Sequence, residues 1–165
     1  MIEISIEQLE PGNAEQKAAF AALNREWLEK YFRVEPVDEA IFADPERHIL
    51  AGGGAILLAR AEGKYVGVVA LYAHEDGMFE LAKMGVTEAY QGRGIGRRLG
   101  EEIIKLAKQR GLATLYITSN TVLKKAQRLY RSLGFVTSSI PLHSYYQRGN
   151  ITLEKSLVLE KEAVA

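Results

Sequence analysis

Residues 80–99 read ELAKMGVTEAYQGRGIGRRL, and the organisation of the rest of the chain can be worked out from this stretch. The apolar run at 79–86 is short enough to be a strand, and the apolar residues from Ile95 onward recur at helical spacing. Between strand and helix, three glycines at alternate positions leave the backbone bare: Gly92, Gly94 and Gly96. Because the start of a helix carries unpaired N–H groups and a partial positive charge, this stretch predicts a cradle for phosphate oxygens.

Two common phosphate-binding patterns do not fit these glycines. A Walker loop ends in Gly-Lys followed by Ser or Thr, but Gly96 is followed by two arginines. A dinucleotide fingerprint needs a third glycine three residues after Gly-x-Gly, where this chain has Arg97 or Leu99. A tight turn without a ligand is the simpler alternative, but one glycine suffices for it and each further one costs about 0.5–1 kcal/mol relative to alanine. Phosphate binding is therefore the favoured interpretation.

The composition is that of an ordinary globular protein, with 47% hydrophobic and 25% charged residues. A length of 165 residues predicts one domain, residues 1–165, with a full-sized core. The absence of cysteine excludes disulfides, a thiolate nucleophile and cysteine-ligated metals, and the three histidines lack ligand spacing, so we expect no metal. Without a long apolar run or a signal peptide at the first residues, we expect a cytoplasmic protein with no membrane partner.

Charge is zero overall but unevenly distributed along the sequence. Residues 1–50 hold eleven acidic and five basic residues, whereas residues 91–131 hold two acidic and ten basic residues. The basic region surrounds the glycines and suits an anionic ligand. The acidic region is compatible with a cationic amine substrate or, more simply, with solvated helix faces. Neutral overall charge and the lack of a recognition motif make a nucleic-acid partner a poor fit.

Periodicity and turn residues predict a single α/β layer with a mixed sheet. Strands are expected at 2–9, 55–61, 65–73, 78–86, 113–119, 135–139 and 151–159. Helices are expected at 13–31, 36–44, 95–110 and 122–133. The strand at 151–159 is expected to be an edge strand, which would allow pairing with a second copy in a homodimer.

Gln91, Gly94 and Gly96 form the pattern Gln-x-x-Gly-x-Gly, which resembles the acetyl-coenzyme A signature of the Gcn5-related N-acetyltransferases, the GNAT family. The resemblance covers nearly the whole chain; it is sharpest from 79 to 136 and weak in residues 1–50. It implies a mostly antiparallel six- to seven-stranded sheet with helices on both faces. It also implies two central parallel strands that splay apart.

The resemblance implies acetyl-coenzyme A as the co-substrate. Pantetheine would pair with the backbone at the end of the 78–86 strand, at Met84 and Val86. The pyrophosphate would lie on the amides of the loop, so the cofactor-binding candidates there are Gln91, Gly92, Arg93, Gly94, Ile95, Gly96 and Arg97. Both Met84 and Val86 can be core residues at the same time, because backbone pairing leaves their side chains unused.

A second motif, Ala126-x-x-Leu-Tyr130-x-x-x-Gly134-Phe135, resembles the closing motif of the same family. There the tyrosine points at the sulfur of coenzyme A, so Tyr130 is the candidate general acid that protonates or hydrogen-bonds the departing thiolate. The alternative is that Tyr130 is a core residue of its helix. Asn120 resembles the asparagine that contacts pantetheine, although its spacing to Ala126 departs from many members. Asn120 can equally well be the N-cap of the 122–133 helix.

Transfer to an amine needs a neutral amine, and an alkylammonium has a pKa of about 10.4, so a general base helps. Glu80 matches the position of the catalytic glutamate in the histone-acetylating branch of the family. The alternatives are that Glu80 points to solvent or to Lys83, or that a water chain replaces the base. A backbone N–H near Val86 would stabilise the tetrahedral oxyanion.

The acceptor site is expected between the 31–38 link and the 141–150 linker. Its substrate-binding candidates are Tyr31, Phe32, Tyr146 and Arg148, with Arg33, His143 and Tyr145 nearby. Arg148 is placed to hold a carboxylate of an amino acid or peptide. The expected function is acetyl transfer from acetyl-coenzyme A to a small-molecule or peptide primary amine by direct attack in a ternary complex. The alternative is a non-catalytic acyl-coenzyme A sensor.

Overall fold

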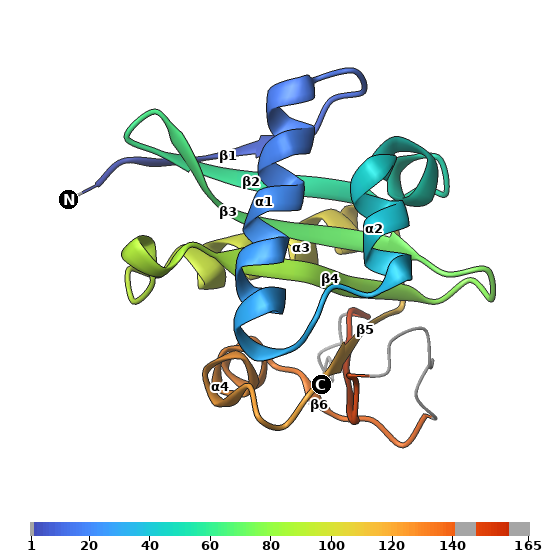
Figure 1. The fold of residues 1–165 in the computed structure, drawn as a ribbon. Coiled ribbons are helices and arrows are strands. Elements are labelled where there is room, and N and C mark those ends of the chain that lie inside the picture. Colours follow the sequence, from blue (N-terminus) through green and yellow to red (C-terminus); the bar gives the residue numbers. More distant parts are fainter. Residues whose placement is uncertain (1, 141–147, 159–165) are drawn as a thin grey trace.

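In a computed structural model that describes residues 2–140 and 148–158, the chain forms a seven-stranded sheet of order β1-β2-β3-β4-β5-β7-β6 flanked by helices (Figure 1). The strands are β1 (Ile4–Gln8), β2 (Ala55–Ala61), β3 (Lys64–Ala73), β4 (Phe79–Val86), β5 (Thr114–Ser119), β6 (Val136–Thr137) and β7 (Ile151–Ser156). The α-helices are α1 (Ala14–Tyr31), α2 (Pro36–Ala43), α3 (Ile95–Gln109) and α4 (Lys124–Ser132). Two short helices, η1 (Glu46–Leu50) and η2 (Glu88–Tyr90), complete the described elements.

The two faces of the sheet bury separate hydrophobic cores, because successive side chains of a strand point to opposite faces. In β2, Ile56 and Leu58 pack with α1, α2 and η1, whereas Leu57 and Ala59 pack with α3 and the residues around α4. Figure 1 shows α1 and α2 in front of the sheet with α3 behind it. This arrangement confirms the expected sheet with helices on both faces.

The centre of the sheet contains its one parallel pair among the described strands. β4 and β5 are joined at a single position, Glu80 opposite Tyr116, whereas β4 pairs with β3 from Phe79 to Val86 with one register shift. Beyond Glu80, β4 runs on to Val86 without a partner on its β5 side within the described strands. The expected splay of two parallel strands is therefore present. The strands separate toward the C-terminal end of β4, which leads into the glycine-rich loop.

The C-terminal strands differ from expectation. β6 spans two residues instead of 135–139, and it pairs with β7 on the side away from β5. β7 therefore lies inside the sheet between β5 and β6, so the prediction that 151–159 is an edge strand was wrong. The homodimer stays a prediction, without the edge strand from which it was argued. The sequence pattern did not reveal this position because a short return strand such as β6 contributes only two exposed residues. No helix in the described ranges is both long and apolar enough to cross a membrane.

Candidate active site

The splay between β4 and β5 opens into a cleft of about 540 Å³, a volume typical of small-molecule sites. The glycine-rich loop and the start of α3 form one end, and α1 with the residues after it forms the other. The described residues with a predicted binding or catalytic role line this cleft with one exception. They are Tyr31, Phe32, Glu80, Met84, Val86, Gln91, Gly92, Gly94, Ile95, Gly96, Arg97, Asn120, Tyr130 and Arg148.

The glycine-rich loop presents backbone N–H groups to the cleft. Gly92 and Gly94 have φ values of +78° and +80°, in the left-handed region that favours glycine, and α3 starts directly after them. A Cβ built on either residue meets no atom within 4 Å, so the loop backbone faces open space. No hydrogen bond among residues 2–140 and 148–158 is donated by the backbone nitrogens of 92–97. The loop therefore fits a phosphate group through donors that the fold itself does not use.

Side chains around the loop fix its shape. Gln91 donates from Nε2 to the carbonyl of Val86 at 2.9 Å and so ties the loop to the end of β4. Arg97 contacts Ser132 of α4 at 2.9 Å and Glu101 one turn along α3 at 2.9 Å. Arg93 is the predicted residue outside the cleft lining; its guanidinium lies over the Tyr90 ring, 5.1 Å from the centroid.

Tyr130 reaches the cleft from α4, and its ring packs edge-on against Phe135 with centroids 6.4 Å apart. Burial raises the pKa of Tyr130 to about 12, and the negative charge of Glu80 adds to the effect. The phenol is therefore protonated throughout the physiological pH range. Its hydroxyl makes no hydrogen bond within the described part of the chain, so it is available to a ligand.

Glu80 lies at the point where β4 and β5 meet, with its side chain 7% exposed. Oε1 is 2.7 Å from Nε2 of His74, and Oε2 accepts from the backbone N–H of Thr118 on β5 at 3.4 Å. The alternatives in which Glu80 points to solvent or to Lys83 were wrong. A register shift in the β3–β4 pairing, with Lys83 at φ +54°, turns the Lys83 side chain toward α2 instead.

Asn120 is not the N-cap of the following helix. α4 begins at Lys124 with Leu123 as its N-cap, and Asn120 Oδ1 instead accepts from the N–H of Val122 at 2.9 Å in an Asx turn. Its Nδ2 donates to the carbonyl of Arg148 at 2.6 Å. Asn120 thus links the end of β5 to the residues that precede β7, and it lines the cleft.

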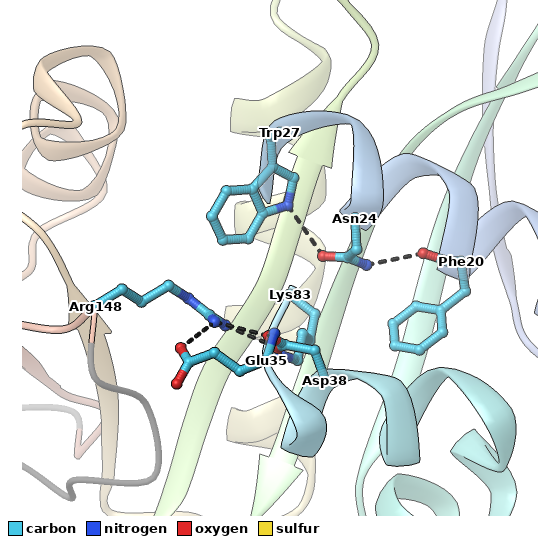
Figure 2. A network of polar contacts seen from close by, with 7 residues as sticks. All are labelled: Phe20, Asn24, Trp27, Glu35, Asp38, Lys83 and Arg148. Atoms are coloured by element: carbon cyan, nitrogen blue, oxygen red, sulfur yellow. Dashed lines mark hydrogen bonds and ion pairs between the residues drawn. The ribbon is translucent and has the colours of Figure 1, made fainter. Parts of the chain in front are cut away.

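A buried network of charges joins Arg148, Asp38, Glu35 and Lys83 beside Trp27 (Figure 2), and Lys83 and Arg148 of this network line the cleft. Arg148 makes two hydrogen bonds to Asp38, at 2.8 and 2.9 Å, and a third to Glu35 at 2.8 Å. Lys83 donates to Asp38 from the other side, and both side chains are nearly inaccessible, 2% and 0% exposed. The guanidinium predicted to hold a substrate carboxylate therefore already contacts two carboxylates of the protein.

Asp38 lies between two cations, Arg148 and Lys83, and the pKa values of Asp38 and Lys83 are both shifted in this network. Arg148 and Lys83, with the backbone N–H of Glu35, lower the pKa of Asp38 to about 2 against the cost of burial. Burial lowers the pKa of Lys83 to about 8, because the attraction of Asp38 only partly offsets it and Arg148 adds a like charge. The carboxylate is thus the group on which the network depends.

The remaining wall of this end is aromatic. Trp27 of α1 lines the cleft, and its Nε1 donates to Asn24 at 3.1 Å, which in turn donates to the carbonyl of Phe20 at 2.9 Å (Figure 2). Phe32 meets Trp27 edge-on, with ring centroids 6.4 Å apart. Tyr31, a predicted substrate-binding residue, lines the cleft and is 50% exposed. The predicted residues Tyr146, His143 and Tyr145 lie outside the described residues.

Sequence reasoning missed His74, Asp38 and the packing role of Trp27 at the site. The contact of His74 with Glu80 could have been predicted from the hairpin turn at Asp76-Gly77. Counting back across this turn places Tyr72 opposite Glu80, and His74 is only two residues after Tyr72. For Asp38, the third residue of a short helix, no local pattern indicates a partner 45 residues away. Such a contact depends on how α2 packs on the sheet.

Comparisons with known proteins identify the family and the fold of this chain. The sequence profile described as the acetyltransferase (GNAT) family matches residues 18–135. A GNAT-family acetyltransferase from Staphylococcus aureus superposes with a TM-score of 0.83 over 94% of this chain and 100% of that one, at 21% identity. A putative acetyltransferase from Salmonella typhimurium, solved with acetyl-coenzyme A, superposes with a TM-score of 0.72 over 94% and 95% of the two chains at 18% identity. At these identities the two structures establish the fold alone.

Curated relatives match over about half of the chain. N-acetylaspartate synthetase from Xenopus tropicalis is 36% identical over 84 residues, which are 50% of this chain and 31% of that protein. N-alpha-acetyltransferase RimI from Mycobacterium tuberculosis is 38% identical over 94 residues, which are 56% and 54% of the two chains. The match thus spans about a third of the synthetase and about half of RimI. With a family profile covering most of its length and a glycine-rich loop at a strand splay, the chain belongs to the acetyltransferase (GNAT) family.

Proposed function

We propose that the protein transfers an acetyl group from acetyl-coenzyme A to a primary amine by direct attack in a ternary complex. The observation that carries this proposal is the convergence of three features on one cleft. These are the unused amides of 92–97, the unpaired edge of β4, and the side chains of Tyr130 and Glu80. The S. typhimurium neighbour solved with acetyl-coenzyme A supports the choice of co-substrate.

In this proposal the loop amides hold the pyrophosphate, and the edge of β4 at Met84 and Val86 pairs with pantetheine. Glu80 accepts a proton from the amine while the amine nitrogen bonds to the thioester carbonyl carbon. The carbon–sulfur bond then breaks and the thiolate leaves. An N–H near Val86 stabilises the oxyanion between these two events.

Tyr130 acts on the leaving sulfur as a hydrogen-bond donor. A pKa of about 12 lies about 3.5 units above that of a thiol, so complete transfer of its proton would be uphill by about 5 kcal/mol. A hydrogen bond requires no such transfer and stabilises the developing thiolate. Of the two roles considered for Tyr130, the raised pKa therefore favours hydrogen bonding over general-acid catalysis.

The acceptor would enter between the aromatic wall and the Arg148 network, with Tyr31, Phe32, Tyr146 and Arg148 as its binding residues. The names of the curated relatives, an N-acetylaspartate synthetase and an N-alpha-acetyltransferase, make amino acids and peptides the first acceptors to test. A carboxylate of such an acceptor would share Arg148 with Asp38 and Glu35. An unchanged acceptor KM in Arg148→Ala would contradict this role of the arginine.

Thiol release from acetyl-coenzyme A across a panel of amines, with products identified by mass spectrometry, tests the proposal. Acetylation of at least one amine, together with a strong reduction in Tyr130→Phe, is the expected result. Calorimetry with coenzyme A, ATP and NAD tests the loop separately. Binding of coenzyme A without thiol release for any amine would favour the non-catalytic sensor, and binding of ATP or NAD alone would contradict both functions.

A further inference from the structure

His74 lies against Glu80 although no motif of the sequence connects the two residues. It follows the last residue of β3, and its backbone N–H donates to the carbonyl of Met78 at 2.8 Å across the β3–β4 hairpin. The imidazole packs against the Tyr72 ring with centroids 4.8 Å apart, and the side chain is 5% exposed. The ring is thus fixed in place by the hairpin and by its aromatic neighbour.

The role of Glu80 as a base requires an ionised carboxylate, and this requirement decides which side chain donates in the contact. Nε2 of His74 is 2.7 Å from Oε1 of Glu80. An ionised carboxylate only accepts hydrogen bonds, so Nε2 must carry a proton and the imidazole is the donor. The other oxygen of Glu80 accepts from the Thr118 amide on β5. Two donors, one from the turn that joins β3 to β4 and one from β5, therefore hold the carboxylate on the wall of the cleft.

We propose that His74 is a positioning residue for acetyl transfer: its Nε2–H fixes the Glu80 carboxylate in the orientation that accepts the proton of the acceptor amine. The inference rests on the proposed function, because it concerns the base of that same reaction. A base must lie within hydrogen-bond reach of the proton it takes, and misplacement by about 1 Å can cost about 100-fold in rate. A freely rotating Glu80 would lose that geometry without any loss of coenzyme A binding.

A double-mutant cycle between His74 and Glu80 tests this proposal. We expect His74→Leu to lower kcat about 10- to 100-fold with the KM for acetyl-coenzyme A unchanged. His74→Gln, whose side-chain amide can donate from a similar position, should recover much of the loss. In the Glu80→Gln background, His74→Leu should have no further effect on kcat, because the residue acts only through the carboxylate. His48→Leu, in η1 away from the cleft, is the matched control and should retain the wild-type kcat.

Several outcomes would overturn the inference while leaving the acetyltransferase activity in place. These are a wild-type kcat in His74→Leu, a wild-type kcat in Glu80→Gln, or equal losses from His74→Leu in both backgrounds. Failure of the proposed function would look different, since the wild-type protein would then release no thiol with any amine. If His74→Leu does not fold, nitrogen-15 NMR of the wild-type imidazole provides the test. A proton on Nε2 is expected, and a neutral ring protonated on Nδ1 alone would overturn the inference.

Discussion

Replacing Asp38 by Asn should strongly destabilise the protein, because it removes the one carboxylate that lies between Lys83 and Arg148. Asp38 is completely buried and accepts from Lys83, from both terminal nitrogens of Arg148 and from the backbone of Glu35. Asparagine has nearly the same shape but only one acceptor oxygen. Its NH₂ group would face donors that are themselves positively charged.

The magnitude follows from the electrostatics of the network. The pKa of Asp38 falls from 3.8 to about 2, which corresponds to about 2 kcal/mol of preference for the ionised form in the folded state. Breaking a buried ion pair by removing one partner typically costs about 3–5 kcal/mol, a total that already includes this preference and the cost of leaving Lys83 and Arg148 without the Asp38 carboxylate. For a protein of this length, such a loss lowers Tm by about 6–20 °C.

Thermal and urea unfolding followed by circular dichroism measure this change. Glu39→Gln is the matched control: Glu39 is the next residue of α2 and pairs with Arg25 at the surface, where little stability is at stake. The pH dependence provides a second check. A lowered carboxyl pKa contributes stability above pH 3.8 that is lost as the pH falls through about 2, so the difference between wild type and variant should narrow over that window.

The reasoning would be refuted if Asp38→Asn melted as Glu39→Gln does, or if its deficit were the same at pH 3 as at pH 7. Either result would mean that Arg148 and Lys83 are stabilised by something other than this carboxylate.

Three further changes test the cleft itself. Gly94→Ala places an alanine at φ +80°, at a strain of about 1–2 kcal/mol, and should weaken the binding of coenzyme A measured by calorimetry. Gly12→Ala is equally strained but lies outside the cleft, so it should leave that binding unchanged. Tyr130→Phe should retain coenzyme A affinity but lower kcat about 100-fold or more; an equal loss in affinity and kcat would speak against its role at the sulfur. Gly85→Ala places a Cβ 2.7 Å from Cδ1 of Trp27, so the indole must shift and the KM for the acceptor should rise. An unaltered acceptor KM together with unaltered Trp fluorescence would contradict this prediction.

The glycine-rich loop was readable from sequence because its conformation depends on local backbone geometry. Gly92 and Gly94 adopt positive φ values, and the helix begins directly after them, as the spacing of apolar residues indicated. Periodicity and turn residues likewise predicted the seven strands, although β6 is shorter than expected. Each of these features is encoded within a few consecutive residues.

The partners of the charged side chains could not be read in this way. Asp38 and Lys83 are 45 residues apart, and Arg148 and Asp38 are 110 apart, so nothing local distinguishes these ion pairs from exposed charges. The interior position of β7 depended similarly on a two-residue strand whose pairing has no sequence signature.

The sequence by itself determined most of the helices and strands, the glycine-rich loop and the resemblance to the family, because propensity and glycine conformation act over a few bonds. Only the tertiary structure decided that Arg148 contacts Asp38 and that His74 contacts Glu80. The physical reason is that burial makes an uncompensated charge costly, so each charge takes the partner that folding brings beside it, wherever that partner stands in the chain.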